Sequence, residues 1–176
     1  MDRLSTEQAF HDQQARGRAL TFAAQPDRLR FDDDSYLDHE TWIRPAFGML
    51  GAVAGRDVLD YGCGHGMAAV VLARRGARVT ACDLSLAYLQ EAQARARANG
   101  TDVAFAQADG ERLPFADGSF DAVWGNAILH HLDVRTAARE LYRSLRPGGV
   151  AVLCEPWGGN PLLSWARRRL PYPGKG

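Results

Sequence analysis

Short apolar segments alternate with amphipathic segments from residue 57 onward, and this alternation constrains the fold more than any other feature. Five segments have the composition of buried strands: DVLDY, ARVTACD, DVAFAQAD, FDAVWGN and VAVLCEP. Helices are predicted after the first, second and fourth of them. Strands that alternate with helices form parallel sheets through right-handed crossovers. We therefore expect an α/β fold built on a doubly wound parallel sheet of about five strands.

Capping residues predict where the helices between these strands begin and end. Ser85 is expected to cap a helix that runs to about Ala98 and ends at Asn99-Gly100. Asp133 is expected to cap the helix VRTAARELYRSL, and RPGG is expected to form a turn before the last strand. The apolar face of that helix is predicted to comprise Val134, Ala137, Ala138, Leu141 and Leu145.

The segment 1–54 is predicted to form a helical cap, although its apolar periodicity is weak. Ser5 and Gln8 fit a capping box. Ser35 is expected to cap a helix through YLDHETWI, and Pro45 suits the first turn of another helix, PAFGMLGAV.

The remaining chain divides into a core, 55–156, and a C-terminal helix and tail, 157–176. Pro156 to Gly159 are expected to form a loop, and Asn160 begins the predicted helix PLLSWARRRL.

Length, charge and composition exclude several classes of protein. The 176 residues fit one domain, and the hydrophobic content of 46% and net charge of zero are ordinary for a soluble protein. No apolar stretch approaches the roughly 18 residues of a membrane span, and the N-terminus lacks an apolar signal core. The three cysteines are expected to be reduced, which favours a cytoplasmic location. Neither nucleic acid nor a membrane is an expected partner, and the run 167–169 of arginines is interpreted as a solvated helix face.

The stretch VLDYGCGHG, 58–66, follows the first predicted strand and is expected to bind a ligand at its carboxyl end. Its glycines have the spacing G-x-G-x-G, and Met67 stands where a dinucleotide loop has its third glycine. The carboxylate of Asp60 would repel a pyrophosphate but attract an amino group. A nicotinamide dehydrogenase is therefore disfavoured. Cys63 belongs to no C-x-x-C pair and is interpreted as a small filler residue, so no metal site is expected.

Acidic residues also end the second and third predicted strands. Asp83 at the end of the second can accept hydrogen bonds from both hydroxyls of a ribose. Asp109 at the end of the third can accept one from an adenine amine. Capping of a turn or helix is the alternative role for each. Taken together, they indicate a site for a nucleoside that carries an amino-acid tail.

The chain contains four segments, in order, that resemble the successive motifs of class I S-adenosylmethionine-dependent methyltransferases: VLDYGCGHG, VTACDLS, QADGERLPFADGSFDAVWGNAILHHL and LRPGGVAVLCEP. They are most similar to the small-molecule branch, methyltransferase type 11, which includes quinone-biosynthesis enzymes. The resemblance covers residues 55–155. It implies a Rossmann-like core, S-adenosylmethionine as cofactor, and methyl transfer to an oxygen, nitrogen or carbon atom of a small-molecule acceptor.

The resemblance also implies a role for each residue of the glycine loop and the next strand end. Asp60, Gly62 and Gly64 would surround the methionine portion of the cofactor, with Cys63 between them and the Asp60 carboxylate near the ammonium group. Asp83 would bind the ribose hydroxyls.

By the same resemblance, later segments would hold the adenine and the methyl group. Leu84 would pack against the adenine, Asp109 would meet its amine, and the Gly110 backbone would reach a ring nitrogen. Asn126 would lie near the methionine moiety and the methyl group that is transferred.

Two further groups of residues are candidates for the site. Tyr36 and His39 would close the site from the N-terminal helices. Adjacent histidines point in different directions, so His130 and His131 are not expected to bind one metal ion. His131 is a candidate general base, because the ordinary pKa of imidazole suits neutral pH. Capping the following helix and lining the cofactor pocket are its alternative roles.

The chain has too few residues after the fifth strand for the antiparallel β-hairpin with which the resembled fold usually ends. A truncated fold, lacking this hairpin, is therefore expected, either as a fragment or as a shortened natural form. Its fifth strand would be an exposed edge through which the chain self-associates. The alternative to a methyltransferase is thus a non-catalytic domain that binds S-adenosylmethionine or a protein partner.

Overall fold

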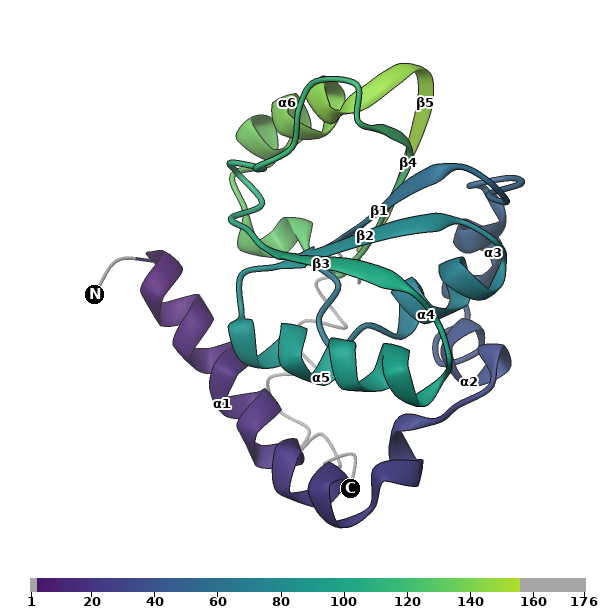
Figure 1. Cartoon of the computed structure of the whole chain (residues 1–176). Coiled ribbons are helices and arrows are strands. Elements are labelled where there is room, and N and C mark those ends of the chain that lie inside the picture. Colours follow the sequence, from purple (N-terminus) through teal and green to yellow (C-terminus); the bar gives the residue numbers. More distant parts are fainter. Residues whose placement is uncertain (1–2, 156–176) are drawn as a thin grey trace, which may run out of the picture.

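A five-stranded sheet forms the centre of the protein in the computed structural model, which describes residues 3–155. The strands have the order β3-β2-β1-β4-β5, and every neighbouring pair is parallel (Figure 1). The strands are β1 (Asp57–Tyr61), β2 (Arg78–Asp83), β3 (Val103–Gln107), β4 (Phe120–Asn126) and β5 (Leu145–Cys154). The order reverses between β1 and β4, and ligands of such sheets bind at this switch. The predicted doubly wound α/β fold is confirmed.

Helices cover both faces of the sheet. The segments before β1 are α1 (Arg3–Ala24), the 3-10 helix η1 (Pro26–Leu29), α2 (Asp33–Leu37) and α3 (Ile43–Gly48). The later ones are α4 (Met67–Arg74), α5 (Leu86–Ala98), the 3-10 helix η2 (Leu129–His131) and α6 (Val134–Ser144). Figure 1 shows α3, α4 and α5 on one face and α6 on the other.

Alternating side chains of the strands fill two apolar clusters, one on each face. Val58 of β1 belongs to the cluster that α3 and α4 complete, and the next residue, Leu59, belongs to the cluster that Leu141 of α6 completes. This alternation is the expected consequence of the two-residue period of a strand. Trp124 is fully buried, and its indole N–H donates to the hydroxyl of Tyr36 at 2.9 Å.

The long helix α1 lies along α5 through polar contacts. Arg18 of α1 donates two hydrogen bonds to Glu91, which also accepts one from Arg95. The Arg95 side chain donates in turn to the backbone oxygen of His65 at 2.8 Å. At the other end of α5, Asp12 of α1 accepts hydrogen bonds from Ser85 and from the Ala87 N–H. These contacts place α1 beside the loop that follows β1.

Two predicted helix caps of the core are confirmed, and two of the N-terminal segment are wrong. Ser85 and Asp133 cap α5 and α6 through hydrogen bonds from the N–H groups three residues later. Ser5 lies inside α1, whose described part starts at Arg3, and is not its N-cap. Asp32 caps α2 by accepting from the Ser35 N–H, so the helix ends at Leu37 instead of running through YLDHETWI. Pro45 lies in the first turn of α3 as predicted, although the helix ends at Gly48.

The region around α6 also departs from the prediction. Ala137 and Leu141 are buried, but Val134 is 53% exposed and Ala138 is exposed, because α6 presents a narrower face to the sheet. The RPGG segment lies within β5, where the register against β4 shifts, so that Phe120 pairs with Leu145 and Ala122 with Val150. It is therefore an irregular part of the strand. The loop 156–159, the C-terminal helix and the arginines 167–169 lie outside the described residues, and the three-part division of the chain stays a prediction.

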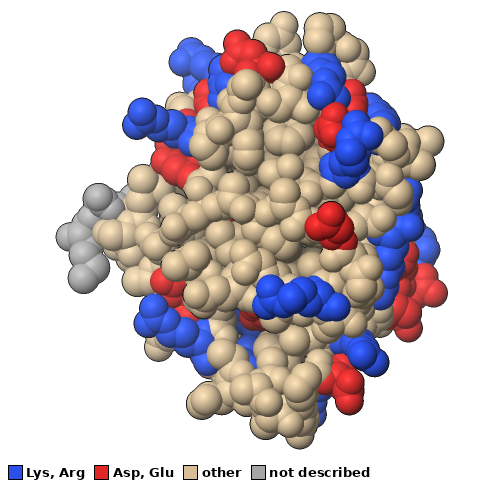
Figure 2. Space-filling view, in the orientation of Figure 1, with Lys and Arg blue, Asp and Glu red and all other residues tan. Residues whose placement is uncertain are grey.

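Charged side chains of both signs are interspersed on the face of the molecule that Figure 2 shows. The arginine and acidic side chains form no large area of one sign on this face. In the described part of the chain, no helix combines the length and apolar character needed to cross a bilayer.

Candidate functional site

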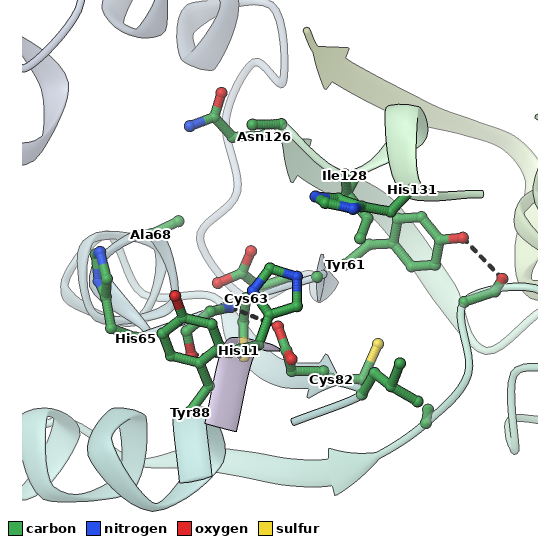
Figure 3. A pocket seen from close by; sticks show the side chains of 18 of the residues that line it. His11, Tyr61, Cys63, His65, Ala68, Cys82, Tyr88, Asn126, Ile128 and His131 are labelled. Atoms are coloured by element: carbon green, nitrogen blue, oxygen red, sulfur yellow. Dashed lines mark hydrogen bonds between the residues drawn. The ribbon is translucent and has the colours of Figure 1, made fainter. Parts of the chain in front are cut away.

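A cavity of about 310 Å³ opens at the carboxyl ends of β1, β2 and β4, where the strand order reverses (Figure 3). Residues 62–65 of the loop after β1 line it, together with residues of α1 and η2. The predicted strand-end carboxylates, Asp60, Asp83 and Asp109, all line it. This agrees with the expectation that the carboxyl ends of parallel strands meet at one edge of the sheet.

Asp60 is a buried carboxylate with an unpartnered oxygen. Its side chain is only 2% exposed, and its Oδ2 atom has no hydrogen-bond partner. Burial raises the pKa of Asp60 to about 7, the nearby Asp83 adds to this, and a hydrogen bond from the Ala69 backbone opposes it. An unsatisfied buried carboxyl group costs stability unless a ligand or a cation pairs with it. The cavity is therefore suited to a ligand with an amino group.

The three glycines of the loop adopt positive φ angles, as the sequence predicts for a tight turn. A Cβ atom on Gly62 would lie 2.6 Å from Ile128, and one on Gly66 would lie 2.6 Å from the Cβ of Ala92. Both glycines are thus required for close packing of the loop. Gly64 is different, because a Cβ atom there would have no neighbour within 4 Å. Gly64 leaves open space in the lining of the cavity.

Asp83 connects the end of β2 to the glycine loop. Its Oδ2 accepts from the Gly64 N–H at 2.8 Å, and its Oδ1 accepts from the Ser85 N–H at 2.8 Å. Burial raises the pKa of Asp83, while these backbone hydrogen bonds and the nearby His11 oppose the shift. A carboxylate has about four acceptor positions, so Asp83 retains capacity for two ligand hydroxyls.

Leu84, which follows β2, and Asp109 and Gly110, which come after β3, also line the cavity. Asp109 accepts a hydrogen bond from the Glu111 N–H at 2.9 Å, and this bond keeps its carboxylate at the turn after the strand. The Gly110 oxygen accepts from the Tyr61 hydroxyl at 2.7 Å, and a Cβ atom on Gly110 would lie 2.6 Å from that hydroxyl. Tyr61, which the sequence did not single out, therefore fixes this turn against β1.

Asn126 lies at the end of β4 and lines the cavity. The next residue, Ala127, has a φ of 57°, the only positive φ of a non-glycine residue in the described chain. Its N–H donates to the Cys154 oxygen at 2.7 Å, which binds the turn to β5. Such strain is found at functional sites, where the surrounding structure holds it.

Aromatic side chains from distant parts of the chain form the outer wall. His11 of α1 lies between Tyr88 and His131, with ring centroids 5.5 Å and 5.2 Å away, as Figure 3 shows. His65 faces Tyr88 at 6.5 Å, and burial lowers the pKa of His65 to about 4. His11, His65 and Tyr88 were missed by the sequence prediction, since no local pattern marks them as neighbours.

The cysteines of the site are inert thiols. Cys63 and Cys82 both line the cavity, and neither forms a disulfide. Burial raises the pKa of the Cys63 thiol and raises that of Cys82 to about 12, so both stay protonated at neutral pH. In residues 3–155, no three His, Cys, Asp or Glu side chains are arranged to hold a metal ion.

The structure brings nearly all of the predicted site residues to this cavity. Its lining includes Tyr36, Asp60, Gly62, Cys63, Gly64, Asp83, Leu84, Asp109, Gly110, Asn126 and His131. His39 is exposed and is not part of the lining, because α2 ends before it. Asp133, and not His131, caps α6, so that alternative for His131 is excluded.

The sequence of this region matches a known family. Residues 59–153 match the family model described as a methyltransferase domain. The chain belongs to this methyltransferase family. The match extends from the third residue of β1 almost to the end of β5, so it covers the strand ends that form the cavity.

Individual methyltransferases resemble the chain in sequence and in structure. A demethylmenaquinone methyltransferase of Beutenbergia cavernae is 40% identical over 121 residues, which are 66% of this chain and 49% of that protein. A solved S-adenosylmethionine-dependent methyltransferase of Mesorhizobium loti has a TM-score of 0.58 at 32% identity, over 64% of this chain and 52% of its own. A geranyl diphosphate C-methyltransferase of Streptomyces coelicolor, solved with S-adenosyl-L-homocysteine, has a TM-score of 0.56 at 28% identity, over 66% and 46%. The chain thus spans about half the length of these methyltransferases.

Proposed function

We propose that this protein binds S-adenosylmethionine in the cavity and transfers its methyl group to a small-molecule acceptor. The observation that carries the proposal is the unpartnered, buried Asp60 carboxylate beside the open space at Gly64. These two features fit the ammonium group and the backbone of a methionine tail. The family of the chain and the names of its relatives support the same chemistry.

The remaining residues fit the rest of the cofactor. Asp83 would accept hydrogen bonds from the ribose hydroxyls, and Leu84 would pack against the adenine. Asp109 would accept from the adenine amine, with the Gly110 backbone beside it. Asn126, which ends β4 and lines the cavity, would lie near the methyl group.

The charges of the cavity disfavour a dinucleotide. Its charged lining residues include Glu7, Asp60, Asp83 and Asp109, and no arginine or lysine is found among the lining residues of the described chain. A pyrophosphate requires a cationic or N–H-rich environment. This argument supports the sulfonium cofactor over a nicotinamide one.

The protein would contribute orientation and exclusion of water. The cofactor supplies an activated methyl group, so that the barrier falls mainly through positioning of the acceptor. Buried Tyr36 and Trp124 at the inner wall, and α1 over the opening, would keep water from the site. We expect an uncharged or cationic acceptor, since the lining carries carboxylates. The three free cysteines support a reducing, cytoplasmic location.

Calorimetry with S-adenosylhomocysteine and a methyl-transfer assay test this function. Binding of the purified chain to S-adenosylhomocysteine, and incorporation of labelled methyl into a metabolite extract, are the expected results. Mass spectrometry of the labelled product would then identify the acceptor. A folded chain that binds NADH but not S-adenosylhomocysteine would contradict the proposal.

Proton release on binding is a specific prediction of the Asp60 assignment. The pKa of Asp60 is about 7, so the group is mostly protonated at pH 6, and a cationic ligand favours its ionised form. Affinity for S-adenosylmethionine is therefore expected to rise between pH 5 and pH 7. Calorimetry at pH 6 in two buffers of different ionisation enthalpy should detect release of up to one proton, and Asp60→Asn should abolish that release. Equal heats in both buffers would contradict the assignment.

The same pKa predicts how stability depends on pH without the cofactor. The folded-state pKa of about 7 lies above the ordinary value of about 3.9, so between these values the folded chain binds more protons than the unfolded one. The contribution of Asp60 to the free energy of unfolding therefore falls as pH rises through this window. The stability advantage of Asp60→Asn over wild type should grow by about 1–3 kcal/mol from pH 5 to pH 8. Urea unfolding measures it, with exposed Asp102→Asn as the control that shows no such growth.

A non-catalytic binding domain is the second candidate, and one observation favours it. In the described chain β5 lies at the edge of the sheet, so its outer backbone groups are open to pairing with another strand. This candidate predicts S-adenosylhomocysteine binding without methyl transfer, and a dimer in size-exclusion chromatography with light scattering. Turnover by a monomer would exclude it.

A further inference from the structure

His131 lies at the mouth of the cavity, in contact with the N-terminal helix. It is the last residue of η2 and lines the cavity together with Glu7 and His11 of α1. Its Nδ1 atom lies 3.8 Å from the Oε1 atom of Glu7, and its ring centroid lies 5.2 Å from that of His11 (Figure 3). A carboxylate at this distance from Nδ1 favours the tautomer with the proton on Nδ1. The Nε2 atom is then free of a proton and able to accept one.

Titratable groups from three elements surround His131. Their net effect, together with burial, is to lower its pKa and so favour the neutral imidazole near pH 7. Burial lowers its pKa, and so do His130 beside it and His11 of α1. Glu7 of α1 and Glu155, which follows β5, oppose this shift. A neutral imidazole with a carboxylate nearby can take up a proton, because the carboxylate stabilises the imidazolium that forms.

The neighbouring His130 has a different role. Its Nδ1 atom lies 2.8 Å from Glu155, its side chain is 49% exposed, and it is not part of the cavity lining. Glu155 also accepts hydrogen bonds from the N–H groups of Ile128 and Leu129, and it thereby stabilises the start of η2. His130 is therefore the matched control for His131, since both are histidines of one short helix.

We propose that His131 accepts the proton of an acceptor hydroxyl during methyl transfer, and that Glu7 is the positioning residue that stabilises its charged form. This inference rests on the proposed function. The acceptor oxygen forms a bond to the methyl carbon, the carbon–sulfur bond breaks with its electron pair on sulfur, and the hydroxyl proton moves to Nε2 of His131. The positive charge of the sulfonium thus moves to an imidazolium beside Glu7. The acceptor class is an uncharged, weakly acidic hydroxyl compound such as a phenol, because the cavity carries several carboxylates and no lining arginine or lysine in the described chain.

Imidazole titration by NMR tests the pairing without any turnover. The labelled full chain is titrated with S-adenosylhomocysteine bound, in wild type and in Glu7→Gln. The proton affinity of His131 is expected to fall about threefold to tenfold in Glu7→Gln, because the opposite charge near Nδ1 is lost. An unchanged His131 titration would overturn the role of Glu7.

Two acceptor probes test the proton transfer itself. The phenolic probe 1-naphthol must lose a proton, whereas isoquinoline, an uncharged bicyclic compound of similar shape, is methylated on nitrogen with no proton to lose. His131→Gln is expected to slow methylation of 1-naphthol about 100-fold or more, within the range of general-base effects, and to change that of isoquinoline less than about threefold. Glu7→Gln should lower kcat for 1-naphthol, leave KM unchanged and move the acidic limb of the pH profile to lower pH. His130→Gln removes a neighbour that lowers the pKa of His131 but leaves the base itself in place, so it should slow methylation of 1-naphthol far less than His131→Gln does.

The outcomes separate this inference from the proposed function. Absence of S-adenosylhomocysteine binding in wild type contradicts the proposed function itself. Binding with equal loss for both probes in His131→Gln shows a structural role and overturns the inference. Binding without methylation of either probe by wild type contradicts the acceptor class. Circular dichroism of each variant confirms that it is folded.

Discussion

Replacement of Asp83 by asparagine is expected to weaken S-adenosylhomocysteine binding about 100-fold or more. The carboxylate would accept hydrogen bonds from two ribose hydroxyls, and hydrogen bonds to charged groups contribute about 1.5–3 kcal/mol each. Its burial strengthens them, because water competes little at this depth. The Asp83 carboxylate also accepts a hydrogen bond from the Gly64 N–H, so an amide in its place would disturb the glycine loop. Calorimetry measures the affinity directly.

Stability and a control variant distinguish a lost ligand contact from a damaged fold. Asp102→Asn makes the same chemical change at an exposed position before β3, at the opposite end of the strand from the cavity. It should bind S-adenosylhomocysteine as wild type does. Thermal unfolding of Asp83→Asn should show a native transition, lowered by the weaker hydrogen bonds to Gly64 and Ser85. Affinity within threefold of wild type would show that Asp83 does not bind the ribose.

Gly66→Ala is expected to cause the largest loss of stability in the glycine loop. Gly66 is the N-cap of α4 with a φ of 81°, a conformation that costs other residues about 1–2 kcal/mol. The added Cβ would lie 2.6 Å from the Cβ and 2.9 Å from the Cα of Ala92, so α4 and α5 would have to move apart. Overpacking of this kind costs about 1–3 kcal/mol. The combined loss predicts a melting temperature lower by about 5–15 °C in calorimetry of the cofactor-free chain.

Gly64→Ala is the matched control, with a different expected pattern. Its φ is 50°, but no atom lies within 4 Å of the added Cβ, so only backbone strain of about 1 kcal/mol is expected. Its binding of S-adenosylhomocysteine should nevertheless fall at least about tenfold, because the methyl group occupies space that the methionine tail needs. Equal losses of stability in both variants would contradict the packing argument.

The core elements could be predicted from the sequence because their signals are local. Apolar runs that end in glycine or aspartate mark β1 and β2, and Ser85 and Asp133 mark the helix starts with side-chain oxygens that accept nearby N–H groups. The predicted caps failed in the N-terminal segment, where the local signals are ambiguous. Asp32 caps α2 by accepting from the Ser35 N–H, and Ser5 lies inside α1.

The residues of the candidate site also fall into those that the sequence predicted and those that it did not. Asp60, Asp83 and Asp109 could be assigned together from the sequence, because the carboxyl ends of parallel strands share one edge of the sheet. The aromatic wall could not be assigned, because Tyr88 and His11 meet only through the docking of α1 on α5. The apolar periodicity of the segment 1–54 is weak, and it does not show which neighbour α1 packs against.

The sequence by itself determined the parallel sheet, the glycine loop and the carboxylates at the strand ends, because each depends on residues close together in the chain. The tertiary structure alone decided which side chains lie over the glycine loop and the strand-end carboxylates. It brought Glu7 and His11 to His131, left one oxygen of Asp60 without a partner, and excluded His39 from the cavity. The physical reason is that burial, and with it the pKa of a carboxylate or imidazole, depends on every element packed around the group.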